Sequence, residues 1–144
     1  MSSGCGLFSA DDAEFLRRPL YGFFSAARGS TPPQPRPVWF ELTPEGAVQI
    51  FTAPGSPKVR NIRSDSRASI VVSAPVGESE RWIAIAGHAM VEPEGARALL
   101  SRLASRYWDL GDPSRANMLE EMLAEDWVRV VIQPQKIYRY SLDS

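Results

Sequence analysis

The sequence predicts a β-rich α+β fold, in which six antiparallel strands form a small barrel and short helices cover its open ends. Segments rich in β-branched and aromatic residues recur along the whole chain. The first three such segments have no helical pattern between them, and short turns join most neighbouring segments. A parallel sheet would need a long crossover, usually a helix, between neighbouring strands. An antiparallel barrel with peripheral helices is therefore the expected class.

The composition is that of one globular domain. The chain has 144 residues, 44% of them apolar, and a formal net charge of −1. This balance excludes a disordered chain and gives no general electrostatic argument for a nucleic-acid partner. One cysteine excludes an intrachain disulfide, and no apolar run is long enough for a membrane helix. We expect a single domain over residues 1–144, with residues 1–8 flexible and a cytoplasmic location.

Each element in the first third of the chain has a local signal. Ser9 and Asp12 form a capping pattern for a helix that reaches about Arg18, where Pro19 follows. The next apolar segments read as strands, separated by a Pro-rich loop and a Pro-Glu-Gly turn. These expected strands are residues 21–27, 36–43 and 47–52, with the loop at 28–35 and the turn at 44–46.

The rest of the chain continues with strands and two amphipathic helices. Gly87 interrupts a long strand, where we expect a bulge or a bend. Leucines at helical spacing indicate a helix after this strand, and Asp112 with Pro113 begins a second one. The expected strands are residues 68–74, 81–91 and 127–133, the helices are 94–108 and 112–125, and an extended tail covers 136–141.

Residues 51–67 carry the clearest sign of a binding site. Ser56 and Pro57 suit the first positions of a short helix, yet Lys58 and Arg60 place positive charge at its positive end. That placement costs about 0.3–1 kcal/mol per charge unless an anion is bound there. Together with the Thr52 hydroxyl, these groups indicate a phosphate site. A solvated surface helix and a nucleic-acid stripe are the alternatives on local features alone.

Three motifs carry a family resemblance. The run G-S-P-K-V-R-N-I-R-S-D-S-R-A-S-I-V-V comes after R-P-V-W-F-E-L and precedes R-W-I-A-I-A-G-H-A-M-V. Over residues 21–91 this pattern resembles the pyridoxamine 5′-phosphate oxidase-like proteins, a flavin-binding split-barrel family. The segment W-V-R-V-V-I-Q-P-Q-K-I-Y-R-Y is similar to the last strand of its short, single-domain members.

The resemblance implies a homodimer with FMN bound at the subunit interface and a small organic molecule as substrate. One branch of the family uses the deazaflavin coenzyme F-420 instead. The implied phosphate contacts are Arg36 and Lys58, assisted by Ser56 and Thr52. The implied ring contacts and further motif positions are Val38, Trp39, Phe51, Arg60, Asn61 and Trp82, with Trp82 offered from the partner subunit.

Three departures from the family pattern limit the resemblance, and one of them is Trp82, which stands where the oxidases have a polar flavin contact. Pro57 stands where many FMN-binding members have a basic residue, which removes one charge and one N–H donor. The basic C-terminal segment that holds substrate phosphate in true pyridoxamine phosphate oxidases does not follow residue 142, so we do not expect that activity. The expectation is an FMN-binding oxidoreductase. The alternatives are a deazaflavin-dependent reductase, a non-catalytic flavin-binding module and a barrel that has lost its cofactor.

No side chain is assigned a catalytic role. His88 is the only histidine in the sequence, and we expect it to be a packed or hydrogen-bonded structural residue. With one histidine and one cysteine in the chain, we expect neither a Ser-His-Asp set nor a metal site of the usual ligand spacing. The four tryptophans are expected to anchor the core or the dimer interface. A flavin performs the redox chemistry itself, so the absence of an obvious acid or base fits the prediction.

Overall fold

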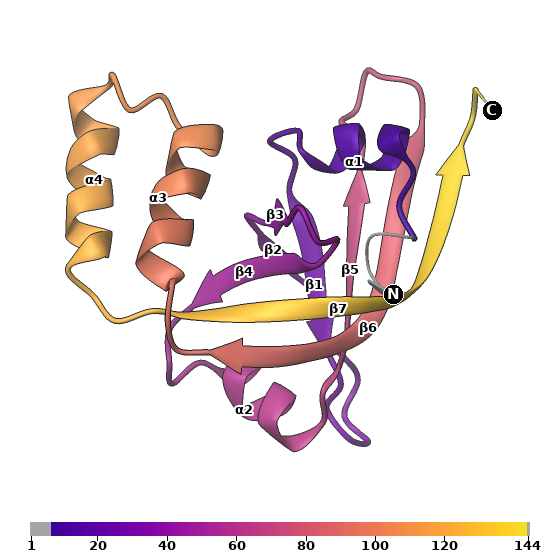
Figure 1. Ribbon diagram of the computed structural model, residues 1–144, viewed down its shortest axis with the longest axis horizontal. Helices are drawn as coiled ribbons and strands as arrows, with labels where there is room; N and C mark the ends of the chain where they lie inside the picture. Colours follow the sequence, from indigo (N-terminus) through magenta and orange to yellow (C-terminus); the bar gives the residue numbers. More distant parts are fainter. Residues whose placement is uncertain (1–6, 144) are drawn as a thin grey trace.

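The computed structural model describes residues 7–143 and contains one antiparallel sheet with helices around it (Figure 1). The sheet has seven strands in the order β2-β1-β5-β6-β7-β4-β3, and it curls into a half-barrel. The prediction that residues 1–8 are flexible falls mainly outside the described part of the chain. No helix in that part has the length and apolar character needed to span a membrane.

Most elements lie where the sequence predicts them. The helices are α1 (Ala10–Leu16), α2 (Pro57–Ser64), α3 (Ala96–Tyr107) and α4 (Pro113–Leu123). The strands are β1 (Gly22–Ala26), β2 (Arg36–Val38), β3 (Glu41–Leu42), β4 (Val48–Thr52), β5 (Arg67–Ser73), β6 (Arg81–Glu92) and β7 (Val128–Ser141). The β-rich antiparallel class with peripheral helices is confirmed.

The prediction of six strands is wrong, because residues 36–43 form two strands instead of one. They separate at Trp39 and Phe40 into β2, which pairs with β1, and β3, which pairs with β4. These two short strands are the opposite edges of the sheet. A link of two residues can join them only if the sheet curls until its edges meet. Pro37 suits the β2 edge, where a missing N–H removes no ladder bond from the interior of the sheet.

The β6–β7 ladder is irregular at Gly87, where the sequence predicts a bulge or a bend, but the extra residue, Gln135, lies on β7. The register between β6 and β7 shifts at Ala86 and Gly87, and a Cβ atom at Gly87 would lie 2.0 Å from the Gln133 carbonyl oxygen. Only glycine allows this close approach of the two backbones. Beyond the shift, the predicted tail 136–141 is part of the same continuous strand and pairs with the beginning of β6. The strand and the tail therefore form one long β7.

The core lies inside the curl, and helices close its ends. Figure 1 shows α1 and α2 at opposite ends of the curled sheet, with α3 and α4 side by side beyond β4. Helix α1 buries Phe15 and Leu16, whereas α2 buries Val59 and Ile62. Helix α3 contributes leucines with no exposed surface, but α4 has no buried residue. The largest fully buried side chains of the sheet and its connections include Phe24, Phe40, Ile50, Ile70, Ile83, Ile85 and Ile132.

An ion pair fastens α1 to β7. Asp12 is only 3% exposed, and its carboxylate accepts from Arg139 Nη2 at 2.7 Å and from the Ser9 backbone N–H at 2.8 Å. Ser9 is the N-cap of α1, and its hydroxyl accepts from the Asp12 backbone N–H, so the predicted capping box is present. Burial acts to raise the pKa of Asp12, but the bonds from Arg139 and Ser9 lower this pKa below its usual value.

We expect Asp12→Ala to lower the free energy of unfolding by about 2–4 kcal/mol, because it removes both a helix cap and a mostly buried ion pair. The difference from the wild type should be complete above about pH 5 and shrink as the pH falls below about 4, since the folded pKa is the lower one. Urea unfolding at several pH values measures both effects.

Asp11→Ala is the matched control for this variant. Asp11 pairs with Arg81 at 3.2 Å but its side chain is mostly exposed, so its loss should cost less than about 0.5 kcal/mol. Equal losses for the two variants would show that the buried pair contributes no more than a surface pair.

Candidate functional site

The first turn of α2 forms as the sequence predicts, with Ser56 as N-cap and Pro57 at the first helical position. The Ser56 hydroxyl accepts from the Thr52 hydroxyl at 3.0 Å, and the Ser56 carbonyl accepts from the backbone N–H groups of Val59 and Arg60. The Arg60 guanidinium turns back and donates to the Gly55 carbonyl at 2.7 Å. Most donors of this helix end are therefore already engaged, so charged side chains must supply the attraction for an anion.

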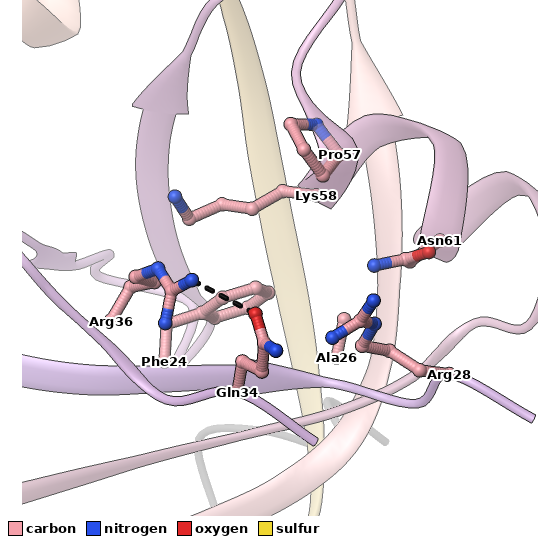
Figure 2. Close-up of a pocket in the computed structure, with 8 residues that line it drawn as sticks. All are labelled: Phe24, Ala26, Arg28, Gln34, Arg36, Pro57, Lys58 and Asn61. Atoms are coloured by element: carbon pink, nitrogen blue, oxygen red, sulfur yellow. Dashed lines mark hydrogen bonds between the residues drawn. The ribbon is translucent and has the colours of Figure 1, made fainter. Parts of the chain in front are cut away.

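Next to this turn lies a cavity of about 190 Å³, which we call the cationic cavity (Figure 2). Strand β1, the loop before β2 and helix α2 form its walls. Figure 2 shows Lys58 and Arg36 pointing toward one another on one side, and Arg28 lying below Asn61 on the other. Its lining residues are Phe24, Ala26, Arg28, Gln34, Arg36, Pro57, Lys58 and Asn61.

The electrostatics of the cationic cavity are unbalanced. None of its lining residues is a carboxylate, and Arg36 donates only to the neutral Gln34 side chain at 2.9 Å and the Pro35 carbonyl at 3.2 Å. The Lys58 side chain is half-buried, and its ammonium has no hydrogen bond or ion pair with any described residue. Burial lowers the pKa of Lys58, and the charge of Arg36 lowers it further. A bound anion would relieve both effects.

A second cavity, of about 370 Å³, has mainly apolar walls, and we call it the aromatic cavity. It lies between β2, the end of β4 and the α3–α4 helices. Lys58 lines both this cavity and the cationic cavity, so the two meet at its side chain. A flat apolar group attached to an anion matches this pair of spaces. The lining residues are Tyr21, Pro37, Val38, Trp39, Phe51, Lys58, Trp108 and Met122.

Trp39 is held in place by other aromatic rings. It stacks on Tyr107 with a centroid distance of 5.0 Å and an interplanar angle of 10°, and it meets Trp108 edge-on at 4.9 Å. The Tyr107 hydroxyl donates to the Leu20 carbonyl at 2.6 Å and accepts from the Phe40 backbone N–H at 3.4 Å. Burial raises the pKa of Tyr107. Helix α3 therefore fixes the corner at which β2 passes into β3.

The structure brings six of the ten predicted site residues to these two cavities. They are Arg36, Val38, Trp39, Phe51, Lys58 and Asn61. Thr52, Ser56 and Arg60 lie beside them but line neither cavity, since their polar groups bond within the turn. Trp82 lies elsewhere, stacked on Tyr140 at 6.0 Å. Its contact with a cofactor from the partner subunit stays a prediction.

Several lining residues have little or no signal in the sequence. Arg28 and Gln34 lie in a loop that is recognised only by its composition, and the charge of Arg28 directly after a strand is the one clue to its role. Trp108 and Met122 come from helices whose place relative to the barrel has no local signature. Tertiary packing alone brings these residues to the site.

His88 is a hydrogen-bonded residue, as predicted, but it is exposed and lies outside both cavities. Its Nδ1 atom is 2.6 Å from the Ser66 hydroxyl oxygen. The described residues contain no cluster of His, Cys, Asp or Glu that could hold a metal ion. Three tryptophans, Trp39, Trp108 and Trp127, belong to one group of contacting aromatic rings together with Phe51.

Comparison with known proteins gives one family match and several solved structures of similar fold. A family model described as pyridoxamine 5′-phosphate oxidase matches residues 9–139. No curated protein matches the sequence significantly. Among solved structures, a conserved hypothetical protein from Mycobacterium tuberculosis has a TM-score of 0.71 at 19% identity, over 93% of this chain and 84% of that chain.

Two further structures have names that mention a cofactor. An F420 reductase is 24% identical with a TM-score of 0.68, over 87% of this chain and 94% of that chain. An FAD-binding protein from Mesorhizobium loti is 17% identical with a TM-score of 0.63, over 92% of this chain and 94% of that chain. At these identities the likeness concerns the fold.

We expect Tyr107→Phe to lower the free energy of unfolding by about 1–2 kcal/mol, because the Leu20 carbonyl and the Phe40 N–H both lose a partner while the stacked ring remains. Near-ultraviolet circular dichroism should also change, since the Trp39 surroundings loosen. Tyr140→Phe is the control, because Tyr140 is exposed and should change stability by less than about 0.5 kcal/mol. An unchanged Tyr107→Phe variant would contradict the role of this hydroxyl.

Proposed function

The chain belongs to the pyridoxamine 5′-phosphate oxidase-like family, and we propose that it is an oxidoreductase that binds FMN across the cationic and aromatic cavities. The observation that carries the proposal is Lys58, a half-buried ammonium without a partner among the described residues, where the two cavities meet. A partly desolvated charge of this kind is costly unless a ligand pairs with it. A phosphate attached to a flat ring system supplies both the charge and the shape.

In this proposal each wall has a separate task. Arg36 and Lys58 hold the phosphate, and Asn61 offers a neutral amide beside them. Val38, Trp39 and Phe51 enclose the ring system and exclude water from one of its sides. A bound flavin supplies the hydride or electron transfer itself. The side chains of this protein therefore bind and orient, and none of them is assigned a proton transfer.

A deazaflavin coenzyme of the F420 type is the second candidate for the same site. Two observations favour it. One is the likeness of fold to an F420 reductase. The other is Arg28, the third cation of the cationic cavity, because a single phosphate can be bound by fewer than three cations. A flavin-binding module without turnover would use the same residues. The substrate in either enzymatic case is a small organic molecule that reaches the ring past Trp108 and Met122.

The visible spectrum of the purified protein is the first experiment. A bound oxidised flavin absorbs visible light, whereas an apoprotein is colourless and can be titrated with FMN and with the deazaflavin by fluorescence. Binding without turnover with any electron donor would favour the module. A protein that binds neither compound would contradict the proposed function.

We expect Lys58→Ala to weaken FMN binding by roughly 1.5–3 kcal/mol, or about 10- to 150-fold in Kd, because it removes a charge-assisted contact to phosphate. Fluorescence titration measures the Kd. Arg63→Ala is the control, since Arg63 is exposed on the same helix and lines neither cavity. Equal effects of the two variants would reduce the role of Lys58 to the general charge of α2.

The affinity should also depend on pH through Lys58. The pKa of this ammonium is lowered in the free protein, so the lysine loses its proton, and the phosphate its partner, at a pH below the usual value of about 10.4. FMN affinity should therefore fall at alkaline pH. In Lys58→Arg the guanidinium stays charged, and this decline should disappear.

We also propose that two copies of the chain associate through the outer face of the sheet. The strand register aligns one residue from each of four neighbouring strands in a row across this face. From β1 to β7 these residues are Phe23, Val71, Ala84 and Tyr138. The stacked rings of Trp82 and Tyr140 lie in the next row. Phe23, Trp82, Tyr138 and Tyr140 are exposed large apolar side chains. A contiguous surface of this kind is typical of a protein interface.

Tyr138→Glu should convert a dimer into a monomer, because it places a charge in the middle of this row. Sedimentation should show twice the 15.9 kDa chain mass for the wild type and the single chain mass for the variant. Val76→Glu, at a fully exposed position in the loop between β5 and β6, is the control. A wild-type monomer at micromolar concentration would contradict the dimer.

A further inference from the structure

A third cavity, of about 360 Å³, continues from the cationic cavity on the outer side of β1 and β5. Arg28 and Ala26 line both spaces, so the two cavities are neighbours. The polar groups of the third cavity are two guanidinium groups and three hydroxyls, from Arg28, Arg67, Ser25, Thr31 and Ser69. No carboxylate lines it. This composition suits a negatively charged ligand.

The two arginines differ in their commitments. Arg67 is paired with Asp65, with Nη2 2.5 Å from the carboxylate, and this arginine lowers the pKa of Asp65 to about 2. Arg28 has no side-chain hydrogen bond or ion pair with any described residue. In Figure 2 it lies apart from Arg36 and Lys58, on the opposite side of the cationic cavity. The cationic cavity thus contains two separate positive centres, the Lys58–Arg36 pair and Arg28. Of these residues, Arg28 is the one that also lines the third cavity.

Ser25 provides an independent observation. Its hydroxyl is buried and has no hydrogen-bond partner. An unsatisfied buried polar atom costs about 1–3 kcal/mol, so its presence needs an explanation. Ser25 lines the third cavity beside Ser69, its cross-strand neighbour. Rotation about χ1 lets a serine hydroxyl turn to an acceptor placed in such a cavity.

We propose that the third cavity is a second anion subsite, which holds a negatively charged group joined to the cofactor beyond its first phosphate. This inference rests on the proposed function, since it assumes that the first phosphate lies between Arg36 and Lys58. The three cavities then form one path, with the ring in the aromatic cavity, the first phosphate at Lys58 and the second anion at Arg28. A diphosphate of a dinucleotide and the carboxylates of a glutamyl tail have the required charge.

The experiment compares pairs of cofactors that share the ring and first phosphate but differ in the group attached beyond that phosphate. Kd values are measured for FMN against FAD, and for the deazaflavin coenzyme without and with its glutamyl tail. In at least one pair the extended cofactor should bind tenfold or more tightly than its shorter counterpart. Whether FAD or the deazaflavin shows this gain identifies the source of the second anion.

Variants of the third cavity should remove this gain selectively. Arg28→Ala should weaken the extended cofactor at least tenfold and FMN less than threefold. Ser25→Ala should weaken the extended cofactor about threefold, leave FMN unchanged and keep the melting temperature of the apoprotein, because no hydrogen bond is lost in the free protein. Ser73→Ala is the control, since Ser73 also lies on β5 but does not line this cavity.

Three results would overturn the subsite. The first is that neither extended cofactor binds better than its shorter counterpart. The second is an equal loss of short and extended cofactor in Arg28→Ala, and the third is a Ser25→Ala variant that changes only the sedimentation of the dimer. If the wild type binds no flavin at all, the proposed function fails separately. Tripolyphosphate then serves as the probe in thermal unfolding: stabilisation that Arg28→Ala removes supports the subsite, and no stabilisation contradicts it.

Discussion

The link of two residues between β2 and β3 is the constraint on which the rest of the structure depends. Because Trp39 and Phe40 join the two edges of a seven-stranded sheet, the sheet must curl until those edges meet. Phe40 has no exposed surface, and its carbonyl accepts from Arg106 while its N–H donates to Tyr107. The curl places Arg36, at the start of β2, opposite Lys58 on α2. The positive site is thus a consequence of how the barrel closes.

The distribution of charge separates this site from the rest of the surface. Five described arginines are paired with carboxylates, at Glu78, Asp65, Asp11, Glu41 and Asp12. In the cationic cavity Arg28, Arg36 and Lys58 have no such partner. In a chain with a formal net charge of −1, this concentration of unpaired cations is local. Mutual repulsion and desolvation make this group of cations unfavourable in the free protein. Such an arrangement is expected at a site that binds an anion.

The range of each physical effect decides how much of the structure the sequence predicts. Ser9 and Ser56 act through their near neighbours in the sequence, and the helix caps predicted at both are confirmed. An irregularity is also present at Gly87, although the backbone that it approaches, at Gln133, is distant in the sequence. The predicted number of strands is wrong because residues 36–43 have continuous β character, while their division depends on two distant strands, β1 and β4. Arg28 escapes prediction for the same reason. Its loop reaches α2 only when β1 is paired, and no spacing in the sequence records that contact.

The two helices beyond β4 stabilise the aromatic cavity in different ways. Helix α3 buries leucines completely and holds Trp39 through Tyr107, so this wall is packed like the core. Helix α4 has no buried residue and is held by polar contacts to its C-terminal end. The Trp127 indole N–H donates to the Met122 carbonyl at 2.6 Å. The Arg97 guanidinium donates to the Leu123 carbonyl at 3.0 Å. Met122 itself is a flexible side chain at the cavity. Under the proposed function, the wall packed by α3 therefore orients the ring, and the wall at Met122 on α4 meets the substrate.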